Sequence, residues 1–170
     1  FGLCTSVSAM IGAYIGGRID DHLGSLVTLK VSVFMTCLIL LALVSIQTDQ
    51  IGFWFTVSTQ PVWDFPYFTT IAEVVYFGTN QVFALFFVTA LSASRTLMAK
   101  ICPPEKATQF FGLYGLSGSV TAFLAPLLVA TTTQWFDSQR AGFASLVVLI
   151  AVGGVMLFAV TDVRSETPTT

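Results

Sequence analysis

The sequence predicts an all-α protein, a polytopic bundle of about five transmembrane helices. Of its 170 residues, 55% are hydrophobic and only 9% are charged, and the mean hydropathy is +0.83. Apolar runs of about 20 residues recur along the chain, and a helix of that length crosses the hydrocarbon core of a bilayer. We therefore expect the lipid bilayer to surround most of the chain.

The apolar runs place the expected helices in order. A window of about 19 residues gives spans near 26–47, 71–94, 108–133 and 141–161, after a shorter run at 1–17. The transmembrane bundle then covers 1–161, and the polar segment 162–170 is expected to be a disordered tail. The chain starts inside an apolar run without an initiator Met or a signal peptide, which predicts a fragment of a longer protein.

The distribution of Lys and Arg predicts the orientation of these helices. The second connection has no Lys or Arg, and the fourth has only Arg140. The other basic residues flank the first connection, the third connection and the tail: Arg18 and Lys30, then Arg95, Lys100 and Lys106, then Arg164. Because positively charged short loops stay in the cytoplasm, we expect the first and third connections and the C-terminus to be cytoplasmic.

Polar side chains distinguish inner from outer helices. The spans at 26–47 and 141–161 have almost nothing polar at membrane depth, as expected of lipid-facing helices, whereas the other spans carry Ser, Thr, Tyr, Asn and Gln. Asn80 and Gln81 are adjacent amides near the middle of 71–94, where an unsatisfied polar group is costly. Two interpretations remain open: an interhelical hydrogen bond or a contact with substrate.

Glu73 also has two interpretations. An ionisable residue in a transmembrane helix suggests proton coupling. Thr70 and Glu73, however, have the spacing of a capping box, in which Thr70 caps the helix and Glu73 reaches back to the Thr70 backbone. We favour the capping box, which places Glu73 at the outer end of its helix.

The span at 108–133 combines glycines, hydroxyl groups and a proline. Gly112, Gly115 and Gly118 precede Pro126 in this span. In the first run, Gly12 and Gly16 form a small-residue pair. Pro126 leaves the carbonyl near Ala122 without its helical donor and makes the helix bendable, so it is a gating candidate. Tyr114, Ser117 and Thr121 lie close to one face and are further candidates for the substrate cavity, although such hydroxyls also bond back to their own helix.

The outer connection at 48–69 is long and aromatic, and we assign no chemistry to it. Trp54, Trp63 and Tyr67 are expected at the level of the lipid headgroups. The alternation of apolar and polar residues around Phe53, Phe55 and Val57 is equally typical of a short strand or hairpin.

Several kinds of chemistry have no support in the sequence. Cys4, Cys37 and Cys102 lack metal-ligand spacing, so we expect no metal and no disulfide. The single histidine, His22, lies in an expected loop, and no paired acidic residues at membrane depth suggest an enzyme. No basic patch suggests a nucleic-acid partner. We expect no cofactor, and the absence of a Gly-rich phosphate loop favours an ion gradient over ATP as the energy source.

The first connection, "GGRIDDHLGS" at 16–25, concentrates charge in a chain that has little. Solvated charges marking the cytoplasmic side are one interpretation. Gly17, Ile19, Asp21, Gly24 and Leu29 also have the spacing G-x-L-x-D-x-x-G-x-x-x-x-L. This spacing resembles the signature loop of the major facilitator superfamily, between the second and third helices of each six-helix half. Asp21 could then accept hydrogen bonds from the N-terminus of another helix, which the resemblance places in the absent half.

A second stretch carries a closer resemblance. Its elements are Ser94-Arg95, Pro103 to Lys106, Phe110 to Tyr114, Pro126 and "SQRAG" at 138–142. Together they resemble the autophagy-linked vacuolar effluxer branch of the superfamily, including its bacterial members. Arg95 is then either part of an inner gate, as the resemblance implies, or a snorkelling anchor at the membrane surface.

The resemblance implies a fold and a function. The chain would form helices eight to twelve of a twelve-helix transporter, whose missing N-terminal half shares a substrate site near the bilayer midplane. We expect a secondary active transporter of small solutes, with amino acids or related metabolites foremost. The resembling branch implies efflux, but the residues leave open the direction of transport and whether the coupling ion is a proton or another ion. The expected location is the bacterial inner (cytoplasmic) membrane, or the vacuolar membrane in a eukaryote. A non-transporting scaffold or receptor on the same fold is the alternative.

Overall fold

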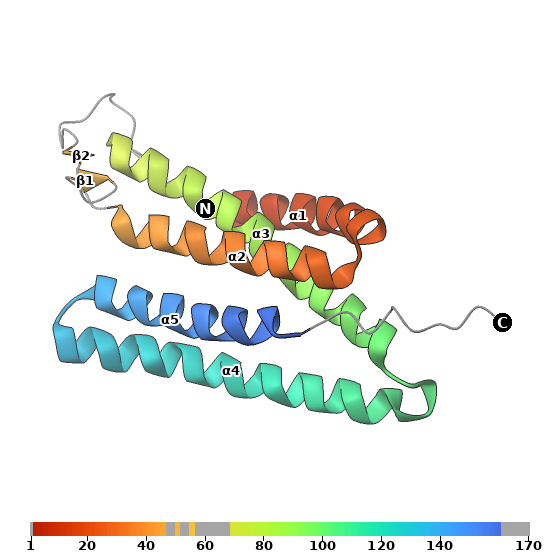
Figure 1. Cartoon of the computed structure of the whole chain (residues 1–170). Helices are drawn as coiled ribbons and strands as arrows, with labels where there is room; N and C mark the ends of the chain where they lie inside the picture. Colours follow the sequence, from red (N-terminus) through yellow and green to blue (C-terminus); the bar gives the residue numbers. More distant parts are fainter. Residues whose placement is uncertain (1, 47–49, 52–54, 57–68, 161–170) are drawn as a thin grey trace.

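The computed structural model describes residues 2–46, 50–51, 55–56 and 69–160, and in these ranges long helices dominate (Figure 1). The helices are α1 (Gly2–Leu23), α2 (Ser25–Ser45), α3 (Ile71–Ile101), α4 (Ala107–Phe136) and α5 (Gln139–Phe158), with a 3-10 turn, η1 (Pro104–Lys106), before α4. Within the described ranges, α2, α3, α5 and the η1–α4 unit are each long and apolar enough to cross a membrane. The predicted all-α transmembrane class is confirmed.

The outer connection contains two short strands. β1 (Gln50–Ile51) and β2 (Phe55–Thr56) pair antiparallel, with Gln50 opposite Thr56 and Ile51 opposite Phe55. The hairpin alternative is therefore the one that the structure contains. Trp54, Trp63 and Tyr67, like the tail at 162–170, lie outside the described residues, so the expectations for them stay predictions.

Three helices, α1, α3 and α4, extend beyond the C-terminal ends of the apolar runs from which they were predicted. α1 continues to Leu23, so Arg18, Asp20, Asp21 and His22 occupy its last turns and not a loop, which corrects our expectation for residues 18–23. The only residue between α1 and α2 is Gly24, whose φ of 88° favours glycine. Charged residues continue a helix readily where it leaves the hydrocarbon, because the backbone hydrogen bonds remain satisfied there. Hydropathy reports the hydrocarbon boundary and not the end of the helix.

α3 begins at the capping box expected from the sequence. The Thr70 hydroxyl accepts a hydrogen bond from the Glu73 backbone N–H, and the Glu73 carboxylate accepts one from the Thr70 N–H, each at 3.4 Å. Glu73 is thus at the helix terminus, as predicted. The 31 residues of α3 correspond to roughly 46 Å, which exceeds the ~30 Å hydrocarbon core.

The helices form two groups that meet at α2 and α5. α3 crosses α1 and α2 and packs on both, whereas α4 packs mainly on α5, which in turn contacts α2 (Figure 1). α1 and α4 therefore lie at opposite edges of the bundle. We call the end where α1 passes into α2 and α3 into α4 the Gly24 end. The opposite end, where α4 passes into α5, is the Asp137 end.

The interior combines hydroxyl-bearing residues with small and aliphatic ones. α2 buries four of them along one stripe: Ser25, Thr28, Ser32 and Thr36. Its opposite face exposes large apolar side chains: Val27, Val31, Phe34, Leu38 and Leu41. The expectation that this helix has almost nothing polar at membrane depth is therefore wrong: a row of hydroxyls faces the bundle beside buried Leu and Ile side chains, and large apolar side chains cover the outer face. This pattern is typical of membrane helices that pack through small residues.

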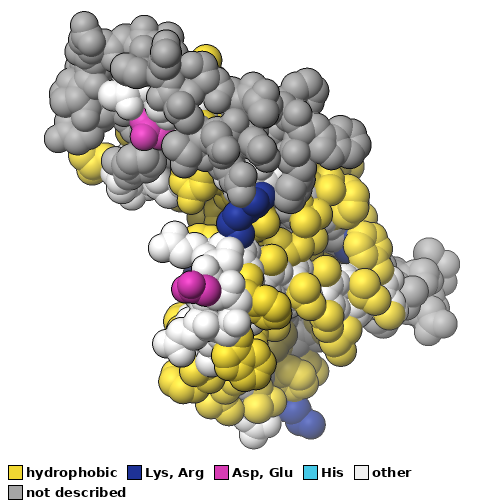
Figure 2. Space-filling model, turned by 90° about the vertical axis from the view of Figure 1, so that its left-hand side faces the viewer, with side chains coloured by type: hydrophobic (Ala, Val, Ile, Leu, Met, Phe, Trp, Pro, Cys, Tyr) yellow, Lys and Arg dark blue, Asp and Glu magenta, His cyan; other side chains and the backbone are white. Residues whose placement is uncertain are grey.

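Hydrophobic side chains cover most of the described outer surface. Figure 2 looks onto the Asp137 end and the flank beside it, where yellow side chains outnumber the few charged ones. Among the residues described, α4 buries none, and its Gly112, Gly115 and Gly118 have no neighbouring atom where a Cβ would be. The α4 surface is thus available to lipid or to another helical unit.

Candidate substrate pathway

The two adjacent amides of α3 have different surroundings. Gln81 faces α1: its Oε1 accepts a hydrogen bond from Ser8 Oγ at 3.0 Å, and its Nε2 donates to Thr5 Oγ1 at 3.5 Å. Asn80 is half-buried, and its amide has no hydrogen bond to any other residue that the structure describes. Gln81 therefore links two helices, whereas the Asn80 amide retains its capacity to bind a ligand.

α1 and α3 approach closely beside these amides. A Cβ at Gly12 would lie 2.8 Å from Leu85 Cα, and one at Gly16 would lie 2.7 Å from Thr89 Oγ1. The buried Thr89 hydroxyl contacts the Gly12 carbonyl and its own Leu85 carbonyl, each at 2.9 Å. The small-residue pair formed by Gly12 and Gly16 therefore lets the backbones of α1 and α3 approach closely.

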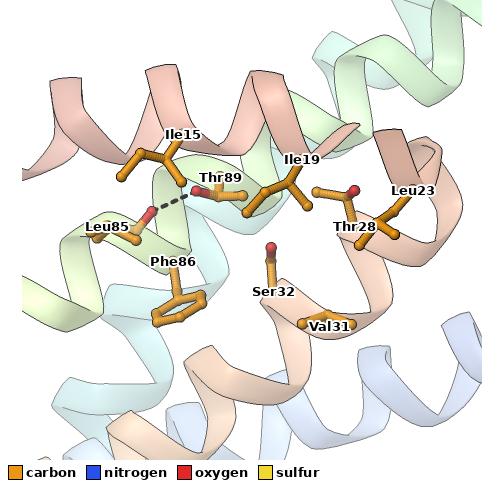
Figure 3. A pocket seen from close by; sticks show the side chains of 9 residues that line it. All are labelled: Ile15, Ile19, Leu23, Thr28, Val31, Ser32, Leu85, Phe86 and Thr89. Atoms are coloured by element: carbon orange, nitrogen blue, oxygen red, sulfur yellow. Dashed lines mark hydrogen bonds between the residues drawn. The ribbon is translucent and has the colours of Figure 1, made fainter. Parts of the chain in front are cut away.

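A small cavity lies between α1, α2 and α3 (Figure 3). Its volume is about 120 Å³, and its walls are almost entirely apolar. The lining residues are Ile15, Ile19 and Leu23 from α1, Thr28, Val31 and Ser32 from α2, and Leu85, Phe86 and Thr89 from α3. None of the predicted substrate residues lines it. Pockets for small molecules are typically about 300–1,000 Å³, so this cavity, several of whose lining side chains are exposed, is smaller than a typical substrate site.

α3 and α4 are joined by one hydroxyl pair near the Gly24 end. Ser94 Oγ and Tyr114 Oη are 2.7 Å apart, and either oxygen can donate. The other two candidates on α4 are exposed and bond back to their own helix: Ser117 Oγ donates to Tyr114 O and Thr121 Oγ1 to Ser117 O. Of the three, Tyr114 alone has a described hydrogen bond from its side chain to another helix.

The predicted gating residues are spread over the bundle. Asp21 and Arg95 are exposed, Gly17 is half-buried, and Gly24 forms the one-residue link. Pro126 is exposed within α4, which remains one helix across it. Buried charge is found at the neighbouring Asp20, whose Oδ2 lies 3.6 Å from Lys100 Nζ. The sequence analysis did not select Asp20, although its position four residues after Gly16 places it on the α3-facing side of α1.

In the described ranges, no three His, Cys, Asp or Glu side chains lie together as a metal site would require. Cys4, Cys37 and Cys102 are free thiols.

Comparison with known proteins decides the family. The family model described as "Vacuole effluxer Atg22 like" matches residues 1–169. The chain belongs to the Atg22-like vacuole effluxer family. A relative of this Atg22-like chain in Bacillus subtilis (strain 168), the uncharacterized MFS-type transporter YxiO, is 35% identical over 72 residues, which are 42% of this chain and 17% of the relative. No solved structure matches the chain.

The family is described by vacuole efflux, and the Bacillus relative is named as a transporter of the major facilitator type. The resemblance inferred from the sequence is therefore confirmed at the level of the family. In this Atg22-like chain two elements of the closer resemblance are physically connected, since Ser94 of the Ser94-Arg95 pair bonds to Tyr114 of the segment from Phe110 to Tyr114. Separation along the chain concealed this contact, and the residue types alone contained no signal for it.

Proposed function

We propose that this Atg22-like chain forms most of one helical half of a secondary transporter that moves small solutes by alternating access. The proposal is supported by the polar side chains that α1 and α3 place together within otherwise apolar helices. Gln81 hydrogen-bonds to α1, whereas the Asn80 amide has no hydrogen bond to the other described residues. A purely structural helix pair has no need of a second amide. Amino acids are the substrates that we favour, because an amide can hydrogen-bond both their ammonium and their carboxylate groups.

In this proposal a second helical half completes the site. The segment matched in the Bacillus relative makes up 17% of that protein, so a protein of such length has room for another bundle. Substrate would bind between the halves near the membrane midplane and contact Asn80, and Thr121, Ser117 and Tyr114 of α4 would line its path toward the Gly24 end. A gradient of protons or of another ion would drive export.

The proposed gate is at the Gly24 end, which we assign to the cytoplasm together with the C-terminus. Asp21 is exposed and can accept hydrogen bonds from the N-terminus of a helix in the other half. Gly17 and Gly24 permit the close approach that this contact needs, Arg95 belongs to the same face of the gate, and Pro126 lets α4 bend. The membrane would be the bacterial cytoplasmic membrane, or the vacuolar membrane in a eukaryote.

Transport by reconstituted vesicles tests the proposal. We expect the complete protein to exchange radiolabelled amino acids, and Asn80→Ala to raise KM about tenfold or more with little change in thermal stability, as loss of a substrate hydrogen bond predicts. Ser119→Ala is the matched control, because this exposed hydroxyl bonds only to Gly115 of its own helix among the described residues. Unchanged KM for Asn80→Ala would remove Asn80 from the site. Substrate binding without exchange would instead favour a receptor or scaffold.

A further inference from the structure

An ion pair at the Gly24 end, with a buried carboxylate and a partly exposed ammonium, connects three helices. Asp20 of α1 is only 5% exposed, and its Oδ2 lies 3.6 Å from the Nζ of Lys100 in the last turn of α3. The same Nζ donates a hydrogen bond of 2.6 Å to Ser25 Oγ, at the first residue of α2. One ammonium group therefore holds the end of α3 to both sides of the α1–α2 corner.

The two members of the pair differ in their contact with solvent. The Asp20 side chain is 7% exposed, and its Oδ1 is buried without a hydrogen-bond partner in the part of the chain that the structure describes. The Lys100 side chain is 36% exposed and can be hydrated when unpaired. The carboxylate thus depends on the ammonium more than the ammonium depends on the carboxylate. Removing Lys100 leaves a buried charge uncompensated, whereas removing Asp20 does not.

We infer that Asp20 and Lys100 form an ionic latch that fixes the end of α3 against the α1–α2 corner. The latch acts within this half of the protein and is distinct from the proposed contact of Asp21 with the other half. The two aspartates are adjacent, but one is buried and the other is exposed. Neighbouring carboxylates thus have separate tasks: Asp20 keeps α3 in register with α1, and Asp21 faces outward.

The register of α3 matters because this helix carries the proposed substrate residues. Gln81 reaches Ser8 and Thr5 of α1, and Ser94 reaches Tyr114 of α4. Lys100 is six residues beyond Ser94, at the end of α3 where the chain turns into η1. Opening the latch would free that end first and leave the contact between Gln81 and α1 in place. Asp20 and Lys100 are therefore positioning residues.

Cys102 provides a reporter for this end of α3. It is the C-cap of the helix, half-buried, and two residues beyond Lys100. In the complete protein with Cys102 as its single cysteine, we expect Asp20→Asn to accelerate alkylation by the membrane-permeant N-ethylmaleimide about 5- to 30-fold, because local opening becomes easier. Lys100→Arg, which keeps the charge, should stay close to wild type. Asp137→Asn, which removes an exposed carboxylate at the far end, should have no effect.

Thermal unfolding in detergent provides the second test. We expect Lys100→Gln to lower the midpoint by roughly 5–10 °C, and the double variant Asp20→Asn/Lys100→Gln to recover part of that loss, because it no longer buries a lone charge. A double variant no more stable than Lys100→Gln, or an alkylation rate for Asp20→Asn within twofold of wild type, overturns the latch. Neither measurement needs a substrate. The latch can therefore be disproved while the transport proposal stands, and the transport proposal can be disproved while the latch stands.

Discussion

At the scale of single residues, the interface of α1 and α3 depends on the absence of side chains. Gly12 and Gly16 let the two backbones approach, and Thr89 fills the contact with a hydroxyl bonded across the interface. Such close approach is a main source of stability between membrane helices, since burial from lipid provides little driving force.

The glycines of this fold are therefore not equivalent. Gly12→Ala would push a methyl group against the Leu85 backbone, and we expect a loss of about 1–3 kcal/mol of unfolding free energy. Gly78→Ala has no atom within 4 Å of the new methyl group and should stabilise α3 by up to about 1 kcal/mol through its helix propensity. Detergent melting curves of the two variants should shift in opposite directions. Shifts of the same sign would refute the packing argument.

The sequence predicted some of these residue roles and missed others. The capping box at Thr70 was predictable because both of its partners are local in the chain. The bond between Gln81 and Ser8 was one of two open interpretations, since it depends on which helix lies opposite. The roles of Asn80, Tyr114, Ser117 and Thr121 in binding substrate stay predictions. Asp20 was missed because charge in an expected loop was assumed to be solvated, whereas this segment is the last part of helix α1 and Asp20 lies on its buried side.

At the scale of the elements, α2 and α5 are held at both ends by reciprocal cationic contacts. Lys30, near the start of α2, donates to carbonyls at and just beyond the end of α5, at 3.5 Å from Phe158 O and 2.7 Å from Val160 O. Arg140, near the start of α5, donates twice to Val44 O in the last turn of α2, at 3.0 and 3.1 Å. Each helix thus supplies a cation to the carbonyls that the other leaves unpaired at its C-terminus.

Neutralising either cation should weaken the pairing of α2 with α5. We expect Lys30→Met and Arg140→Gln each to lower the unfolding free energy by about 1 kcal/mol, and their effects to add because the contacts lie at opposite ends of a helix pair. Lys106→Met is the control, since Lys106 is exposed. Denaturation of the four variants in detergent checks this. A double variant no weaker than either single variant would show that the two contacts are not independent.

Helix existence was predictable from hydropathy, but helix ends and helix faces were not. The averaging window treats Ser and Thr as neutral, so it concealed the buried stripe of α2 formed by Ser25, Thr28, Ser32 and Thr36. A helical projection of the same residues separates this stripe from the exposed Val27, Val31 and Phe34.

At the scale of the whole molecule, the bundle consists of α1, α2 and α3 on one side and α4 with α5 on the other. Composition predicted this class of fold because the bilayer imposes it on any chain so apolar. Which helices pair was not predictable, because hydropathy distinguishes lipid from water and not one helix from another.

The distribution of basic residues makes a prediction about the two ends. We expect Cys102, at the Gly24 end, to react with a membrane-impermeant maleimide only after intact cells are permeabilised, because that end is assigned to the cytoplasm. A cysteine introduced as Asp137→Cys, in the exposed turn between α4 and α5, should react without permeabilisation. Labelling in the reverse order would invert the assigned topology, including the side of the C-terminus.

The single glycine between α1 and α2 couples the movements of these two helices. With no spare chain at Gly24, a tilt of α1 must pull the first turn of α2 with it. The guanidinium of Arg140 hydrogen-bonds to the other end of α2, so the same displacement should also move α5 on the opposite side of the membrane. A displacement of α1 at one membrane face would thus reach the other face, some 30 Å away, through helix α2, which neighbouring helices contact at both ends.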